Sequence, residues 1–233
     1  MAEQTQLPVM LVLDAFFLSH TYEIVDLLEA EQVREFLPPY EPEIKLDTAD
    51  PHSFGNLADP GYYMELRYMI QKAHEEAIGV IETVQKDFAD HFGRSYGLVE
   101  PYMCDDAETI IVTSGTVAST TRAVIDRMRD EGVKIGSLKV RVVRPYPAEA
   151  VLAALSGAKR VIVIDRNISF GYHGIFFQEL KSALYGRLDI PVHGFIAGLG
   201  GRDITPKVVR EIVDKGLAGD GLERDINWIG VKR

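Results

Sequence analysis

The sequence predicts an α/β protein with an open, mainly parallel sheet covered by helices on both faces, preceded by a partial α/β segment and a long helix. Between residues 109 and 205, four apolar runs of strand length are each followed by a turn and a helical pattern, which is the order of repeated βα units. Residues 62–92 repeat apolar side chains every three or four positions, as one amphipathic helix does. A further apolar run, Val9–Leu13, has the continuous character of a buried strand.

The first thirty residues are expected to add one strand and one short helix. A buried strand at Val9–Leu13 needs neighbouring strands, so either later strands or another chain would complete its sheet. A short helix is predicted over Thr21–Leu28. Between these elements, Phe16 and Phe17 are interpreted as core residues and His20 as a hydrogen-bonded loop residue, with contact to a substrate or cofactor as the alternative.

The remaining elements follow from periodicity and from proline and glycine positions. Residues 37–61 are rich in proline and are expected to lack regular structure. The long helix is expected over Tyr62–Phe92, with Gly93 placed to end it. The later strands are predicted at residues 109–112, 138–143, 160–164 and 192–196. The helices after these strands are predicted to reach Met128, to reach Leu155, to run from Gly174 to Tyr185, and to open at Pro206.

Charge and cysteine content argue against several functional classes. The net charge of -10, from 25 basic and 35 acidic residues, argues against binding to nucleic acid or to an anionic membrane surface. A single cysteine, Cys104, excludes a disulfide framework, a cysteine-based zinc site within the chain and an iron–sulfur cluster held by this chain alone. The six histidines are scattered, so no metal site is predicted. Without a signal-peptide pattern or an apolar run of about 20 residues, the chain is expected to be cytoplasmic.

Polar residues follow several of the predicted strands and should gather at one edge of the sheet. In doubly wound sheets the loops at the carboxyl ends of parallel strands share that edge. Ser114-Gly115-Thr116 is interpreted either as an anion site at a helix N-terminus or as a tight turn with a helix cap. The segment Asp165-Arg166-Asn167 is interpreted either as a group that fixes a carboxylate or partner loop, or as a structural Asp–Arg pair. The candidates for cofactor binding are Ser114, Thr116, Arg166 and Asn167.

A cluster of glycines lies between the last apolar run and the last helix. Gly198, Gly200 and Gly201 allow positive φ and a close approach of the backbone to another surface. The cluster lacks the spacing and the lysine of a phosphate-binding loop. It is therefore expected to be a close-contact turn, with Arg202 and Asp203 locking it to the sheet edge or to a neighbouring subunit. No catalytic residue and no recognisable active site is predicted from the residues of this chain.

Seven ordered motifs resemble those of a known family, the alpha subunits of pyruvate:ferredoxin oxidoreductases and related 2-oxoacid:ferredoxin oxidoreductases. The resemblance covers nearly the whole chain. The motifs are Pro8-Val9-Met10, Asp14-Ala15-Phe16-Phe17-Leu18-Ser19-His20-Thr21, Phe36-Leu37-Pro38-Pro39-Tyr40, Phe92-Gly93-Arg94-Ser95-Tyr96-Gly97, Arg144-Pro145-Tyr146-Pro147, Asp165-Arg166 with Ser169-Phe170-Gly171, and Gly198-Leu199-Gly200-Gly201-Arg202-Asp203.

The resemblance implies an enzyme that decarboxylates a 2-oxoacid on thiamine diphosphate with magnesium, passes electrons through iron–sulfur clusters to ferredoxin, and forms an acyl-coenzyme A. It implies that residues 1–97 are the end of a thiamine-pyrimidine-type domain and that residues 98–233 form a transketolase C-terminal-like domain. Ala15 stands where the family usually has glycine, and Ile175 where it often has proline. The first part of the family's first domain, with its activating glutamate, has no counterpart here, so none of these cofactors is expected to bind this chain alone.

The resemblance leads to three hypotheses. In the first, the chain is a structurally supporting subunit, and a separate polypeptide supplies the other half of the pyrimidine-type domain. In the second, it is a non-catalytic assembly module or a degenerate paralogue. In the third, it is an independent anion- or nucleotide-binding α/β domain. The residues expected to serve the structure or an interface are Asp14, Ser19, His20, Arg144, Asp165, Gly198, Gly200, Gly201, Arg202 and Asp203.

Overall fold

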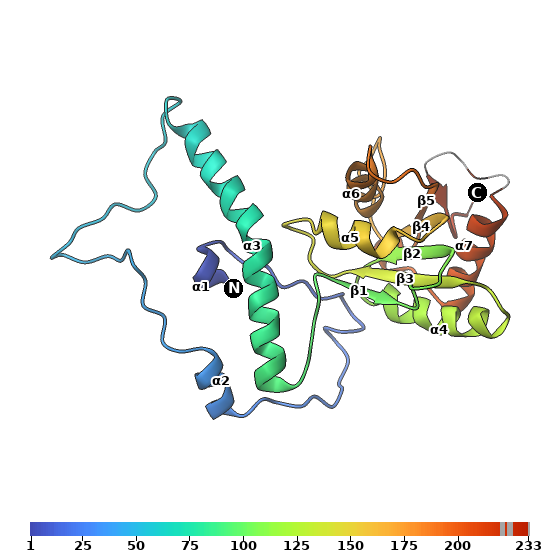
Figure 1. The fold of residues 1–233 in the computed structure, drawn as a ribbon, viewed down its shortest axis with the longest axis horizontal. Helices are drawn as coiled ribbons and strands as arrows, with labels where there is room; N and C mark the ends of the chain where they lie inside the picture. The colour runs from blue at the N-terminus through green and yellow to red at the C-terminus, as the bar shows by residue number, and fades with distance from the viewer. Residues whose placement is uncertain (220–221, 223–225, 233) are drawn as a thin grey trace. The chain divides into compact units, whose positions relative to one another are not determined.

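The chain folds into two compact units, which Figure 1 traces from the N-terminus to the C-terminus in the computed structural model. The first unit contains Met1–Val12 and His20–Tyr96, and the second contains Leu13–Ser19 and Gly97–Arg233. The structure describes residues 1–219, 222 and 226–232. The assignment of residues 1–97 and 98–233 to two named domain types stays a prediction.

The first unit is built on the long helix α3 (Tyr63–Phe92), which confirms the helix predicted over these residues. Gly93 ends it in the left-handed conformation with φ of 67°, and its N–H donates to the carbonyl of Ala89 at 2.8 Å. Two short helices, α1 (Ala2–Thr5) and α2 (Ala30–Phe36), contact α3. As predicted, no helix or strand forms over residues 37–61.

Aromatic rings attach α2 to the C-terminal end of α3. The ring of Phe36 lies 5.6 Å from that of Phe88 and 5.3 Å from that of Phe92, both near edge-to-face. Elsewhere α3 is poorly covered, because its only buried residues are Ala77 and Ile81. Of the remaining residues of the apolar face that the sequence pattern indicated, Leu66 and Ile70 are exposed, whereas Ala73, Val84, Phe88 and Phe92 are half-buried.

The structure corrects three expectations for the first thirty residues. Val9–Leu13 forms no strand, and its side chains are exposed, because none of the strands in the described residues pairs with it. Thr21–Leu28 forms no helix, since side chains such as Ile24 find no surface to pack against. Phe16 and Phe17 are 70% and 68% exposed, so their interpretation as core residues is wrong.

The second unit contains a six-stranded sheet whose strands have the order β1-β3-β2-β4-β5-β6. Among the described strands, β1 pairs antiparallel with β3, and the other four pairings are parallel. This confirms the predicted mainly parallel sheet. The strands are β1 (Val99–Tyr102), β2 (Thr109–Thr113), β3 (Ile135–Val140), β4 (Arg160–Asp165), β5 (Val192–Ile196) and β6 (Asn227–Trp228).

Helices cover both faces of this sheet, as predicted (Figure 1). On one face, α5 (Ala148–Leu155) and α6 (Ile175–Leu184) pack on side chains such as Val112. On the other face, α4 (Val117–Asp130) and α7 (Pro206–Ala218) pack on side chains such as Ile111. The two residues are adjacent in β2 and enter opposite cores because side chains alternate along a strand. Because β2, β4 and β5 pair in parallel, their carboxyl ends meet at one edge of the sheet.

Candidate functional site

The carboxylate of Asp14 fills the turn between β2 and α4 that was a candidate anion site. The backbone N–H and the Oγ1 hydroxyl of Thr116 both donate to Oδ2 of Asp14, at 2.6 and 2.5 Å. Gly115 makes room for it, because a Cβ at this position would lie 2.7 Å from Oδ2 and the residue has a φ of +63°. The turn therefore binds an anion, and the chain itself supplies that anion from 102 residues away.

The surroundings of Asp14 keep its carboxyl group ionised. Nη1 of Arg166 lies 3.6 Å from Oδ2. Burial raises the pKa of Asp14, but the two hydrogen bonds from Thr116 and the charges of Arg166 and Lys139 outweigh it, so the pKa lies below its ordinary value of 3.8. Asp14, Thr116 and Arg166 thus form an anion site that is closed by an internal ion pair.

The residues after Asp14 form a compact turn. Phe16 has a φ of 61°, a left-handed conformation that is costly for an aromatic residue. Its N–H donates to Oγ of Ser19 at 3.0 Å, and the N–H of Phe17 donates to the carbonyl of Ala15 at 2.9 Å. Ser19 therefore has a structural role within the second unit. His20 belongs to the first unit.

Asp165 caps helix α6 and does not pair with Arg166, so the predicted Asp–Arg pair is wrong. Asp165 is fully buried and accepts hydrogen bonds from the N–H groups of Phe176 and Phe177 at 3.0 and 3.1 Å. Adjacent side chains at the end of a strand point in opposite directions, which sends Arg166 to Asp14 instead. Burial raises the pKa of Asp165, and its hydrogen bonds offset this only in part.

The other candidates for cofactor binding also have partners within the chain. Asn167 donates to Asp165 at 3.0 Å and accepts from the N–H of Ile175 at 2.8 Å, so it completes the cap of α6. The hydroxyl of Ser114 donates to the carbonyl of Val140 at 2.8 Å. Arg144 forms an ion pair with Glu179 of α6 and lies outside the Asp14 cluster.

The glycine cluster forms the turn that leads into α7. At Gly198, with φ of +73°, a Cβ would lie 2.6 Å from Cδ1 of Ile204, whereas Gly200 and Gly201 face open space at φ of +65° and +82°. Arg202 donates to the carbonyl of Gly230, just after β6, which supports its predicted locking role within the chain. Thr205 caps α7 by accepting from the N–H of Val208 at 3.4 Å. Asp203 is exposed, and contact of this turn with another subunit stays a prediction.

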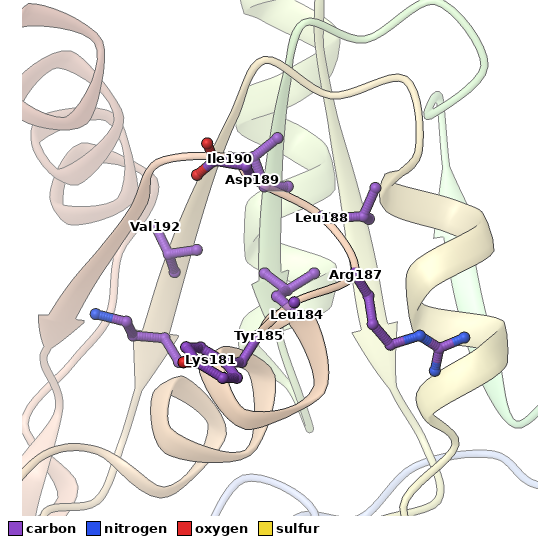
Figure 2. Close-up of a pocket in the computed structure, with 9 residues that line it drawn as sticks. Lys181, Leu184, Tyr185, Arg187, Leu188, Asp189, Ile190 and Val192 are labelled. Atoms are coloured by element: carbon purple, nitrogen blue, oxygen red, sulfur yellow. The ribbon is translucent and has the colours of Figure 1, made fainter.

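A hollow of about 560 Å³ lies at the opposite edge of the sheet (Figure 2). It is formed by the C-terminal end of α6, the loop that follows and the first residue of β5. In Figure 2 the side chain of Arg187 points away toward α5, where it forms an ion pair with Glu149 at 2.6 Å. The hollow therefore contains none of the candidate residues named from the sequence. Its lining residues are Lys181, Leu184, Tyr185, Gly186, Arg187, Leu188, Asp189, Ile190 and Val192.

Neither a group of metal ligands nor a membrane-spanning helix is found among the described residues. Among them, no three histidine, cysteine, aspartate or glutamate side chains are grouped so that they could hold a metal ion. No helix within these residues has the length and apolar character needed to cross a membrane.

Sequence comparisons agree with an α/β protein whose residues divide between two family models. The model described as pyruvate flavodoxin/ferredoxin oxidoreductase, thiamine diphosphate-binding, matches residues 1–86. The model described as pyruvate:ferredoxin oxidoreductase core domain II matches residues 107–209. The chain belongs to the pyruvate and 2-oxoacid:ferredoxin oxidoreductase family, which confirms the resemblance seen in its motifs.

Two curated relatives align with nearly all of this chain. It is 48% identical over 226 residues to the pyruvate synthase subunit PorA of Methanothermobacter thermautotrophicus, covering 97% of this chain and 57% of that protein. It is 42% identical over 238 residues to the ketoisovalerate oxidoreductase subunit VorA of Pyrococcus horikoshii, covering 100% of this chain and 60% of that protein. The chain thus spans somewhat more than half the length of these relatives.

Two solved structures show weaker similarity. A 2-oxoglutarate:ferredoxin oxidoreductase from Magnetococcus marinus has a TM-score of 0.48 at 16% identity, covering 76% of this chain and 29% of that chain. A split-gene transketolase has a TM-score of 0.43 at 16% identity, covering 54% of this chain and 43% of that chain. Because both scores are below 0.5, the family assignment rests on the sequence comparisons.

Proposed function

We propose that this chain is part of a subunit of a thiamine diphosphate-dependent 2-oxoacid:ferredoxin oxidoreductase in the cytoplasm. Such an enzyme oxidatively decarboxylates a 2-oxoacid to an acyl-coenzyme A and passes the electrons through iron–sulfur clusters to ferredoxin. The observation that carries the proposal is the 48% identity to a pyruvate synthase subunit along 97% of the chain. Pyruvate is the proposed substrate, after the name of the pyruvate synthase relative at 48% identity.

The contribution of this chain to the complex is structural. The turn between β2 and α4, the candidate anion site, already holds the carboxylate of Asp14. Asp165 and Asn167 cap α6. We expect thiamine diphosphate and its Mg²⁺ to require further chains, and the described residues contain no group of metal ligands. Other chains of the complex would hold these groups, and also the iron–sulfur clusters, since Cys104 is the one cysteine here.

A separate polypeptide carrying the other half of the pyrimidine-type domain is the proposed partner of the first unit. The first half of α3 presents large apolar side chains to solvent on one face, at the i, i+3 and i+4 positions Leu66, Met69 and Ile70, which are 44%, 64% and 41% exposed. Contiguous apolar surface of this kind marks sites of protein association. A partner that packs on this face would bury these apolar side chains.

Affinity purification of the tagged chain from its native cells, with the co-purifying chains identified by mass spectrometry, tests this proposal. We expect the co-purifying chains to include one with a thiamine-pyrimidine-type half-domain and one that binds iron–sulfur clusters. The purified complex should oxidise pyruvate in a reaction that depends on coenzyme A. Ile70→Glu should abolish co-purification of the half-domain chain, whereas Lys86→Glu, a charge reversal at an exposed position of the same helix, should not. Purification of the chain alone, or of a complex without oxidoreductase activity, would favour an assembly module or a degenerate paralogue.

An independent nucleotide-binding domain is the remaining alternative. It would use the turn at Ser114–Thr116 together with Arg166, but Asp14 occupies both. Calorimetric titration with nucleotides and with coenzyme A should therefore give the same binding heat for the wild-type chain and for Arg166→Gln. Binding that depends on Arg166 would revive this alternative.

A further inference from the structure

Three cations surround one carboxylate between β1, β3 and α4. Glu100 of β1 lies opposite Lys139 of β3 in the antiparallel pair, and the two side chains approach to 3.7 Å. Arg122 of α4 forms an ion pair with Oε1 of Glu100, and Arg141, which follows β3, forms one with Oε2. Three elements of the second unit therefore bring their charged side chains to one point.

Positive charge exceeds negative charge in this region. Burial raises the pKa of Glu100, but the charges of Arg122, Arg141 and Lys139 hold it below its ordinary value of 4.5. Lys139 also lowers the pKa of Asp14, so its charge acts on both carboxylates. Around Glu100, the three cations Arg122, Arg141 and Lys139 outnumber two carboxylates, that of Glu100 and that of Asp126, which accepts from the hydroxyl of Tyr102 beside Arg122. This excess contrasts with the whole chain, where 35 acidic residues face 25 basic ones.

Two neighbouring residues of α4 carry buried polar atoms that have no hydrogen-bond partner among the described residues. These atoms are Nε of Arg122, whose guanidinium belongs to this cluster, and Oγ1 of the fully buried Thr121 before it in the chain. Buried polar atoms without a partner are rare in folded proteins and commonly indicate a water or an ion that completes the site. The side chains of Arg122 and Lys139 are 34% and 25% exposed, so a ligand from solvent can reach their charged ends.

We propose that the surface formed by Arg122 and Lys139 beside Glu100 binds a phosphate group. A guanidinium fork and an ammonium group are the two side chains that proteins use most for phosphate, and the fork can donate two parallel hydrogen bonds. A phosphate monoester carries a charge of about -1.5 to -2 near pH 7, so it offsets the local excess better than a further carboxylate would. The site is distinct from the Asp14 turn and does not depend on the proposed function.

Titration of the full chain with inorganic phosphate, followed by ³¹P NMR and calorimetry, tests the site. The expected result is saturable binding with a dissociation constant of about 1 mM or tighter. Lys139→Gln should weaken it by about tenfold or more, because a charged hydrogen-bond donor is lost. The matched control is Lys134→Gln, since Lys134 lies 3.9 Å from Glu108 with Lys159 at 3.1 Å from the same carboxylate oxygen. Absence of saturable binding, or equal weakening by both variants, overturns the proposal.

Two further measurements separate a ligand site from a purely structural ion network and identify the form of the phosphate. Glu100→Gln removes the resident carboxylate, so phosphate should raise the melting temperature of this variant more than that of the wild-type chain; no difference would contradict a ligand site. Titration with a nucleoside monophosphate distinguishes the sources. Tighter binding than inorganic phosphate indicates an organic phosphate ester, and equal binding indicates the free ion.

Discussion

Thr116 binds a single carboxylate oxygen of Asp14 through both its backbone N–H and its hydroxyl, although the two residues are 102 positions apart. This contact places Leu13–Ser19 in the second unit, while the segments on either side of it belong to the first. It also fills the one turn that resembled a phosphate site. The N–H of Thr116, the charge of Arg166 and the space left by Gly115 thus bind a carboxylate of the same chain.

Asp14→Asn should destabilise the second unit by about 1–2 kcal/mol, because the hydrogen bonds from Thr116 lose their charged acceptor in a partly exposed site. Urea denaturation measures this change, and limited proteolysis should show faster cleavage within Leu13–Ser19. Asp50→Asn is the control, since that carboxylate is 83% exposed and pairs only with nearby His52 among the contacts of its side chain. Equal effects of the two substitutions would refute a special role for Asp14.

The stability of the chain should fall in acid because Asp14 and Glu100 both have lowered pKa values. Carboxyl groups of this kind contribute stability above their ordinary pKa values of 3.8 and 4.5, and this contribution is lost as the pH falls through the lower values of the folded state. The double variant Asp14→Asn/Glu100→Gln should therefore differ most from the wild-type chain near pH 6 and least near pH 3. A difference in unfolding free energy that stays constant between these pH values would contradict this assignment.

Gly174→Ala should cost about 1–3 kcal/mol in unfolding free energy, because the added Cβ would overlap the carboxylate of Asp165 where it caps α6. At Gly157 an added Cβ has nothing within 4 Å and the backbone has no positive φ. Gly157→Ala should consequently change stability by less than about 0.5 kcal/mol. Thermal or urea unfolding of both variants provides the comparison, and an unaffected Gly174→Ala would show that the cap is not tightly packed.

Gly198→Ala should destabilise the chain more than Gly200→Ala. Both residues have positive φ, so each substitution costs about 1–2 kcal/mol in backbone strain. Only at Gly198 does the new methyl group also meet Ile204, at 2.6 Å. Calorimetric melting temperatures would rank the two variants, and the reverse order would mean that Gly200 makes its important contact elsewhere in the complex.

The sequence pattern predicted the parts of the fold that depend on local periodicity. Helix α3 and strands β2, β4 and β5 have strong apolar repeats and lie at or within one residue of their expected bounds. Strand β3 begins three residues earlier than expected, at Ile135, because Gly136 and Ser137 resemble turn residues although both are buried in the sheet. Strand β1 was not predicted, since Pro101 interrupts a four-residue segment that survives only as an edge strand.

The candidate site was less predictable, because its contacts join residues far apart in the chain. The motif containing Asp14 was visible in the sequence, but its pairing with Thr116 and Arg166 depends on the folded sheet edge. Apolar character alone also misled at Val9–Leu13, where strand formation requires neighbouring strands that the described residues do not supply. The cations around Glu100 gave one weak signal, the charged Lys139 between two buried residues of β3.

Reconstitution of the complex from separately purified chains tests the central claim that this chain is a structural part of a 2-oxoacid:ferredoxin oxidoreductase. The measurement is pyruvate oxidation dependent on coenzyme A, with and without this chain. The account predicts activity only when the chain is present, and unchanged KM values for pyruvate and coenzyme A when Arg166→Gln is assembled into the complex. Full activity without the chain would contradict the claim.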